Sequence, residues 1–256
     1  MKRLSLSHRD RSGRPCHSSK IFVIGSGRSG THWVGYILEA HPDIHVTIEK
    51  PPIFEWVTTM ALDPGKRDVL LPKLIERYRI EHQSVSPKHY ADKSHPNIWI
   101  AEELAAAFPE ALFVGIQRNP YATVASMLKH EGVLAWHKRW KEFPVPNRFL
   151  GITHENRAAY ESMPLAAQCA LRWKVHRERL QNLRQTMDSR LLVLNYEDVI
   201  RESEAQLAAL DAFLSLPSAL PKPAVKSESL DRWKTELSEE IKQQIAGVTG
   251  LSPEEC

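Results

Sequence analysis

The sequence has few cysteines and no long apolar run. Its 256 residues include three cysteines, which lie far apart (Cys16, Cys169 and Cys256) and match neither a disulfide framework nor a metal-ligand spacing. Such cysteine usage favours a reducing compartment. No apolar run approaches the ~20 residues that a membrane-spanning helix needs. The sequence therefore predicts no integral membrane association and no metal site built on cysteine.

An excess of charge of one sign is also missing. Lys and Arg number 34 against 31 Asp and Glu, which gives a net charge of +3. This balance disfavours a nucleic-acid partner held by bulk charge, but it leaves room for a local anion site. Residues 1–19 are basic and polar without the apolar stretch of a signal peptide. We expect a disordered tail over 1–19, one domain over 20–256 and a cytoplasmic location.

Strand and helix patterns alternate along the chain. Short apolar runs predict strands at residues 21–25, 111–117 and 191–196. A second strand is expected within residues 43–49, and residues 89–94 resemble a short strand that runs into a loop. Helical spacing predicts helices at residues 32–40, 66–82, 97–108, 121–130 and 165–183. Ser203 and Gln206 match a capping box that would begin another helix. The alternation predicts an α/β fold, a single domain with a central parallel β-sheet flanked by helices.

A glycine-rich loop, GSGRSGT at residues 25–31, joins the first strand to the first helix. Unpaired N–H groups of such a loop and the helix dipole together favour an anion. An ATP- or GTP-hydrolysing loop would continue with Lys and then Ser or Thr, but Thr31 and His32 stand there. The strand 111–117 is followed by Arg118 rather than a metal-binding Asp. Both observations disfavour a nucleotide triphosphatase.

The same loop also fits a dinucleotide site. Gly25, Gly27 and Gly30 match G-x-G-x-x-G, and Glu49 ends the second strand where a ribose-binding acid is expected. The loop alone does not decide between an NAD-dependent oxidoreductase and another anion-binding protein. Arg28, however, lies inside the loop, where a dinucleotide needs no cation.

A second basic site favours a different ligand. Arg118 follows the strand 111–117 at its carboxyl end, where open α/β sheets bind ligands, and Ser126 comes eight residues later. An arginine and a helix hydroxyl can together hold a phosphate through charge-assisted hydrogen bonds. A ligand that touches this site and the loop would carry two separated anionic groups on one nucleotide.

At these residues the chain resembles the sulfotransferase superfamily. The similarity runs from Ile21 to about Lys234 and is strongest at IGSGRSGTHWV, HPDI, DKSH, FPEALFVGIQRNPYATVASM and VLNYED. It implies a P-loop-NTPase-like sulfotransferase fold and the transfer of a sulfuryl group from 3′-phosphoadenosine 5′-phosphosulfate (PAPS) to a hydroxyl or amine, leaving 3′-phosphoadenosine 5′-phosphate (PAP). A non-catalytic nucleotide-binding module is the remaining alternative beside the NAD enzyme.

The resemblance also implies roles for individual residues. Those implied around the 5′-phosphosulfate are Arg28, Ser29, Gly30, Thr31 and His32. Those implied at the 3′-phosphate are Arg118, Ser126 and Lys226, and those implied beside the adenine are Trp33 and Tyr196.

For the chemistry, the resemblance implies that Lys93 assists departure of the bridging oxygen. Two residues could accept the acceptor's proton: Glu49, which follows HPDI, and His95, which follows Lys93. Imidazole suits neutral pH, whereas the loop and HPDI follow the carbohydrate-type pattern with a glutamate, and we favour Glu49 slightly. Since lysine and backbone N–H groups can stabilise the phosphosulfate, no metal is expected.

The acceptor is expected to be a small molecule or a glycan bearing a hydroxyl. The segment 131–164 has the irregular character of a lid or binding loop. Aromatic residues of this segment and of residues 54–56 could line an apolar pocket or stack on sugar rings. They are Trp136, Trp140, Phe143, Phe149, Phe54 and Trp56.

Overall fold

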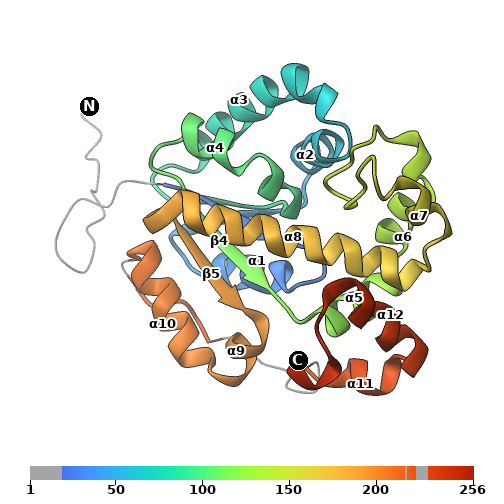
Figure 1. The fold of residues 1–256 in the computed structure, drawn as a ribbon. Coiled ribbons are helices and arrows are strands. Elements are labelled where there is room, and N and C mark those ends of the chain that lie inside the picture. The colour runs from blue at the N-terminus through green and yellow to red at the C-terminus, as the bar shows by residue number, and fades with distance from the viewer. Residues whose placement is uncertain (1–18, 217, 223–229) are drawn as a thin grey trace, which may run out of the picture.

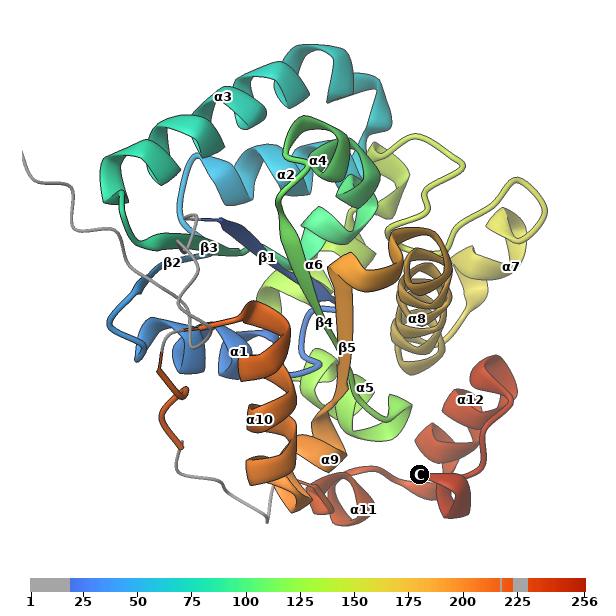
Figure 2. The ribbon, with the colours of Figure 1, turned by 90° about the vertical axis from the view of Figure 1, so that its left-hand side faces the viewer.

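A computed structural model describes residues 19–216, 218–222 and 230–256. Its centre is a five-stranded parallel sheet (Figure 1). The strand order is β2-β3-β1-β4-β5, and all five strands are labelled in Figure 2. The strands are β1 (Lys20–Gly25), β2 (Ile44–Ile48), β3 (His89–Lys93), β4 (Leu112–Gln117) and β5 (Leu191–Asn195). All five strands that the sequence predicts are therefore confirmed, and so is the parallel α/β fold.

Helices cover both faces of the sheet, as Figure 2 shows. In β1, Phe22 and Ile24 join a hydrophobic core with α2 (Ile53–Leu62), α3 (Arg67–Val85), α4 (Ala101–Ala107) and α8 (Leu165–Met187). Ile21 and Val23 join the core on the other face, with α1 (Thr31–Glu39) and α10 (Ser203–Leu214). The side chains of a strand alternate between faces, so a continuous apolar run lets one strand contribute to both cores. This is why the short segment IFVIG forms a central strand.

The helices that form these two layers and the carboxyl end of the sheet are α1 (Thr31–Glu39), α2 (Ile53–Leu62), α3 (Arg67–Val85), α4 (Ala101–Ala107), α5 (Pro120–Leu128), α6 (Glu131–Lys138), α7 (Arg157–Ser162), α8 (Leu165–Met187), α9 (Tyr196–Arg201), α10 (Ser203–Leu214), α11 (Arg232–Glu236) and α12 (Glu239–Thr249). In the described ranges no helix combines the length and apolarity that a membrane span requires.

Three details of the sequence-based prediction were wrong. The capping box at Ser203 is not formed, because the residue before α10 is Glu202, whose N–H is bonded to Asp198 at the end of α9. The predicted helix 97–108 is divided into a 3₁₀ helix (His95–Trp99) and α4. The segment 131–164 is partly helical, since it contains α6 and α7.

A buried hydrogen-bond network holds the end of β3 in place. The fully buried Asp92 carboxylate accepts hydrogen bonds from the Tyr78 hydroxyl, the Asn97 amide and the Thr47 hydroxyl, each at 2.9 Å. Burial raises the pKa of Asp92 to about 6, although these donors oppose the shift. Because the donors come from β2, α3 and the 3₁₀ helix, the network fixes Lys93, the next residue, relative to its neighbours.

Candidate active site

The glycine-rich loop lies between β1 and α1 at the carboxyl edge of the sheet (Figure 1). Gly30, the residue before α1, has φ +99°, and a Cβ atom there would lie 2.5 Å from the Tyr196 ring. Only glycine fits both requirements. The N-terminus of α1 has no side-chain cap, so its first N–H groups are available to an anion.

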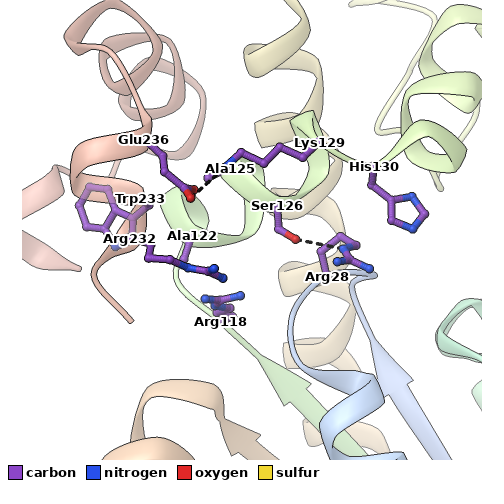
Figure 3. A pocket seen from close by; sticks show the side chains of 10 residues that line it. All are labelled: Arg28, Arg118, Ala122, Ala125, Ser126, Lys129, His130, Arg232, Trp233 and Glu236. Carbon is purple, nitrogen blue, oxygen red and sulfur yellow. Dashed lines mark hydrogen bonds and ion pairs between the residues drawn. The ribbon is translucent and has the colours of Figure 1, made fainter. Parts of the chain in front are cut away.

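A cavity of about 250 Å³ adjoins this loop (Figure 3). Basic and polar side chains from four segments line it: Arg28, Arg118, Ser126, Lys129, His130, Arg232 and Glu236. Arg28 Nε donates to the Ser126 hydroxyl at 3.0 Å, and Lys129 pairs with Glu236 at 2.8 Å. Three arginines and one lysine facing a single acid make this cavity suited to a phosphate group.

Tyr196 lies close both to the loop and to Arg118, which lines this cavity. The guanidinium carbon of Arg118 is 4.3 Å from the centroid of the Tyr196 ring, a cation–π contact. The ring also lies close to Gly30 of the loop, as the Cβ geometry above shows. Tyr196 therefore couples the position of Arg118 to that of the loop.

A cluster of four polar side chains lies beyond the loop, at the ends of β2 and β3. The Glu49 carboxylate pairs through Oε1 with the Lys93 ammonium and lies 3.0 Å from His95 Nδ1. His32 Nδ1 accepts from the Lys93 ammonium at 2.9 Å. Glu49 has φ +47°, an uncommon conformation for a side-chain-bearing residue that is found most often at functional sites.

Burial and mutual charge set the ionisation of this cluster. Burial opposes ionisation of Glu49, but the hydrogen bond from His95 and the Lys93 charge outweigh it, and the pKa of Glu49 falls to about 2. Burial lowers the pKa of His95 to about 4. Burial also lowers the pKa of Lys93, against the opposing effect of Glu49. At neutral pH the cluster thus holds an ionised carboxylate beside a neutral imidazole.

A second cavity, of about 130 Å³, opens onto this cluster. Its walls away from the charged residues are Phe54, Gly132, Val133 and Trp136. Trp136 is supported from behind by Phe149, whose ring centroid is 5.1 Å away. The fully buried Arg172 in turn lies 4.6 Å from the Phe149 centroid. The cavity has room for a small group with an apolar body, positioned against Glu49 and Lys93.

Comparison with known protein families shows which family the chain belongs to. The sequence model described as "Sulfotransferase family" matches residues 74–219, more than half of the chain. The chain belongs to the sulfotransferase family. No curated protein sequence gives a match. Membership argues for sulfotransfer in general and against the NAD-dependent alternative left open by the loop.

Solved sulfotransferase structures share the fold. The sulfotransferase domain from the curacin biosynthetic pathway superposes with a TM-score of 0.59 at 17% identity, covering 92% of this chain and 99% of that one. The sulfotransferase domain of the Synechococcus PCC 7002 olefin synthase superposes with a TM-score of 0.59 at 15% identity, covering 91% of this chain and 94% of that one. A sulfotransferase from Alicyclobacillus acidocaldarius superposes with a TM-score of 0.53 at 15% identity, covering 93% of this chain and 98% of that one. The P-loop-like sulfotransferase fold is confirmed.

In this sulfotransferase the predicted site residues fall into three groups. Arg28, Arg118 and Ser126 line the basic cavity, whereas Glu49, Lys93, His95 and His32 form the polar cluster. Ser29 and Thr31 are buried in the loop, and Trp33 packs partly buried against the core on the α1 side. Lys226 lies outside the described residues.

Only part of the predicted aromatic set reaches the second cavity. Phe54 and Trp136 line it. Trp140 is buried against Tyr160, with ring centroids 5.5 Å apart, and Trp56 and Phe143 pack against the core instead. Of the six aromatic residues expected to line the acceptor pocket, two therefore contact the cavity, and Phe149 packs against one of them, Trp136.

Sequence reasoning missed Lys129, His130 and Arg232 in the basic cavity. Arg232 precedes the buried Trp233, which stacks on Tyr121 of α5 at a centroid distance of 4.8 Å. This aromatic contact brings α11 to α5 and directs Arg232 toward Arg118 (Figure 3). In the sequence, Arg232 is recognisable only as a basic residue next to Trp233, and no local sequence pattern connects it with Arg118.

Proposed function

We propose that this sulfotransferase uses PAPS as donor and transfers its sulfuryl group to a hydroxyl of a small-molecule or glycan acceptor. The observation that carries the proposal is the basic cavity of Arg28, Arg118 and Arg232 beside the glycine-rich loop. One anion at the loop and another in the cavity match the two separated phosphates of a 3′-phosphorylated adenosine nucleotide. Ser126 would donate its hydroxyl hydrogen to the 3′-phosphate.

The loop is proposed to bind the 5′-phosphosulfate. Residues Ser29 to Thr31 lead into the uncapped N-terminus of α1, whose N–H groups and dipole favour an anion there. His32 would contribute from the first turn of the same helix. For the adenine we propose Tyr196, since its ring lies close both to Arg118 and to Gly30 of the loop. The contribution of Trp33 to the adenine and that of Lys226 to the 3′-phosphate stay predictions.

The polar cluster supports an in-line displacement with Glu49 as the general base. The Glu49 side chain is 25% exposed, whereas His95 Nε2 is fully buried. Glu49 Oε2 would accept the hydroxyl proton as the acceptor oxygen forms its bond to sulfur. The bond between sulfur and the bridging oxygen breaks, and that oxygen leaves on the 5′-phosphate of PAP.

Lys93 is proposed to stabilise the leaving oxygen. Its ammonium is 1% exposed and is bonded to Glu49 and His32. When Lys93 turns to the charge that develops on the bridging oxygen, Glu49 loses a hydrogen-bonded cation that lowers its pKa, and the pKa of Glu49 rises toward the range of an effective base. Electrostatic stabilisation of this kind needs no metal ion. The cytoplasmic location and the disordered tail stay predictions.

Calorimetric titration with PAP, NAD and ATP tests the donor. We expect selective binding of PAP, weakened in Arg118→Ala by ~1.5–3 kcal/mol for the loss of a charged hydrogen bond. Preferential binding of NAD would contradict the proposal. Turnover is then tested with PAPS and a panel of acceptors: 2-naphthol, 1-hexanol, N-acetylglucosamine and a tyrosine-containing peptide. Binding of PAP without turnover of PAPS would instead support a non-catalytic nucleotide-binding module.

A further inference from the structure

Two residues line both cavities of the site. Arg28 and His130 face the basic cavity and also the smaller cavity that opens onto Glu49 and Lys93. Arg28 belongs to the glycine-rich loop, and His130 lies in the turn between α5 and α6 (Figure 3). In the proposed function the sulfuryl group starts at the glycine-rich loop, which carries Arg28, and the acceptor lies in the smaller cavity. A group transferred from the loop to that acceptor therefore moves past Arg28 and His130, which line this smaller cavity.

The His130 ring is held in one orientation. Its Nδ1 atom accepts the backbone N–H of Val133 at 3.3 Å and so caps the N-terminus of α6. Burial and the nearby Arg28 charge lower the pKa of His130, which favours the neutral ring at pH 7. In a neutral imidazole whose Nδ1 accepts, the hydrogen is on Nε2. Among the described residues, no hydrogen bond engages this Nε2–H group.

We propose that His130 is a catalytic residue whose Nε2–H donates a hydrogen bond to a sulfuryl oxygen during transfer. The inference rests on the proposed function and adds a residue to it. Negative charge is spread over the oxygens of the group in transit, and a preorganised donor aimed at that charge lowers the barrier. The ring gives up no proton in this step, since it only donates a hydrogen bond.

Lys93 and His130 would act on different atoms. Lys93 extends from β3 on the side of Glu49 and His32, whereas His130 comes from the α5–α6 turn on the side of Ser126 and Arg28. The lysine is therefore placed for the bridging oxygen, and the histidine for the oxygens that travel with the sulfur. No other described side chain besides Arg28 reaches both cavities.

The test separates this role from helix capping. In His130→Asn the side-chain oxygen can still accept the Val133 N–H, so α6 keeps its cap, but the Nε2–H group is lost. We expect turnover of PAPS to fall about 10- to 100-fold, somewhat less than the loss of one oxyanion donor costs in other enzymes. PAP has no sulfuryl group, so its calorimetric affinity is expected to fall much less than turnover, although His130 also lines the basic cavity. His130→Ala, which loses the cap as well, shows the additional cost of capping in a thermal melt.

The assay uses the panel acceptor that the wild type turns over fastest, or release of inorganic sulfate from PAPS into water where no panel acceptor reacts. Unchanged turnover in His130→Asn would overturn the inference. Equal losses of turnover and PAP affinity would also overturn it, because they would place His130 in nucleotide binding. A wild-type protein that binds no PAP, or that binds it and turns over PAPS neither to an acceptor nor to water, would contradict the proposed function itself.

Discussion

His95 Nδ1 lies 3.0 Å from Glu49 Oε1, while the opposite nitrogen of the same ring faces the glycine-rich loop. A Cβ atom on Gly27 would be 3.0 Å from His95 Nε2. Since Glu49 is ionised, the hydrogen of the neutral ring is on Nδ1 and is donated to the carboxylate. His95 therefore orients Glu49 through Nδ1, and the glycine-rich loop covers its Nε2 atom.

This relationship predicts unequal losses when the two residues are changed. Glu49→Gln removes the base and is expected to lower turnover about 10²- to 10⁴-fold, with PAP affinity retained. His95→Asn should lower turnover less, because the carboxylate remains. The double variant should be no slower than Glu49→Gln alone, since an oriented base no longer exists to be disturbed. Steady-state turnover of PAPS measures all three, and a larger loss in His95→Asn than in Glu49→Gln would identify His95 as the base.

The pH dependence of stability provides a separate test of His95. Its pKa in the folded state, about 4, is below the ordinary value of 6.5. Between these values the unfolded chain binds the proton and the folded protein does not, so the stabilising contribution is full above pH 6.5 and is lost as the pH falls toward 4. Urea titrations from pH 7.5 to 5 should show wild type losing more stability than His95→Asn. Parallel curves would mean that His95 is not held neutral.

Arg232 is expected to recognise the 3′-phosphate. Loss of a charged hydrogen bond in Arg232→Ala should weaken PAP binding by ~1.5–3 kcal/mol. Binding of adenosine 5′-phosphate, which has no 3′-phosphate, should be unchanged. Lys234→Ala serves as the matched control, because Lys234 pairs with the exposed Asp231 on the same short helix. Equal weakening of both nucleotides would show that Arg232 acts on the fold of α11 rather than on the phosphate.

Two glycine substitutions should have opposite effects on stability. Gly30→Ala combines a positive φ with a Cβ position 2.5 Å from Tyr196, so it should destabilise the protein by ~1–3 kcal/mol and weaken PAP binding. Gly247→Ala lies in α12 with nothing within 4 Å of the added atom, and should stabilise by ~0.5–1 kcal/mol. Denaturant titration compares both with wild type. A neutral Gly30→Ala would mean that Tyr196 can move away from the loop.

Local patterns in the sequence were sufficient to predict the strands of the sheet and to indicate the anion site. Apolar runs identified β1, β4 and β5, because a parallel strand covered on both faces is rich in apolar residues. The segments of β2 and β3 also hold polar residues and were recognised only as shorter strand-like segments. The loop at residues 25–31 and the position of Arg118 after β4 indicated the anion site, since both features are set by neighbouring residues. Ser203, by contrast, matched a cap whose formation depended on how the preceding helix ended.

Only the tertiary structure decided which distant residues meet. Glu49, Lys93 and His95 come from the ends of two paired strands, so their contacts depend on the register of β2 with β3, where Ile48 pairs with Lys93. His130 and Arg232 reach the cavities because α6 and α11 pack where they do, and no local motif encodes that packing. Side-chain patterns determine the strands and helices, whereas the hydrogen-bond partners and the ionisation of the site follow from burial and distance, which exist only in the folded chain.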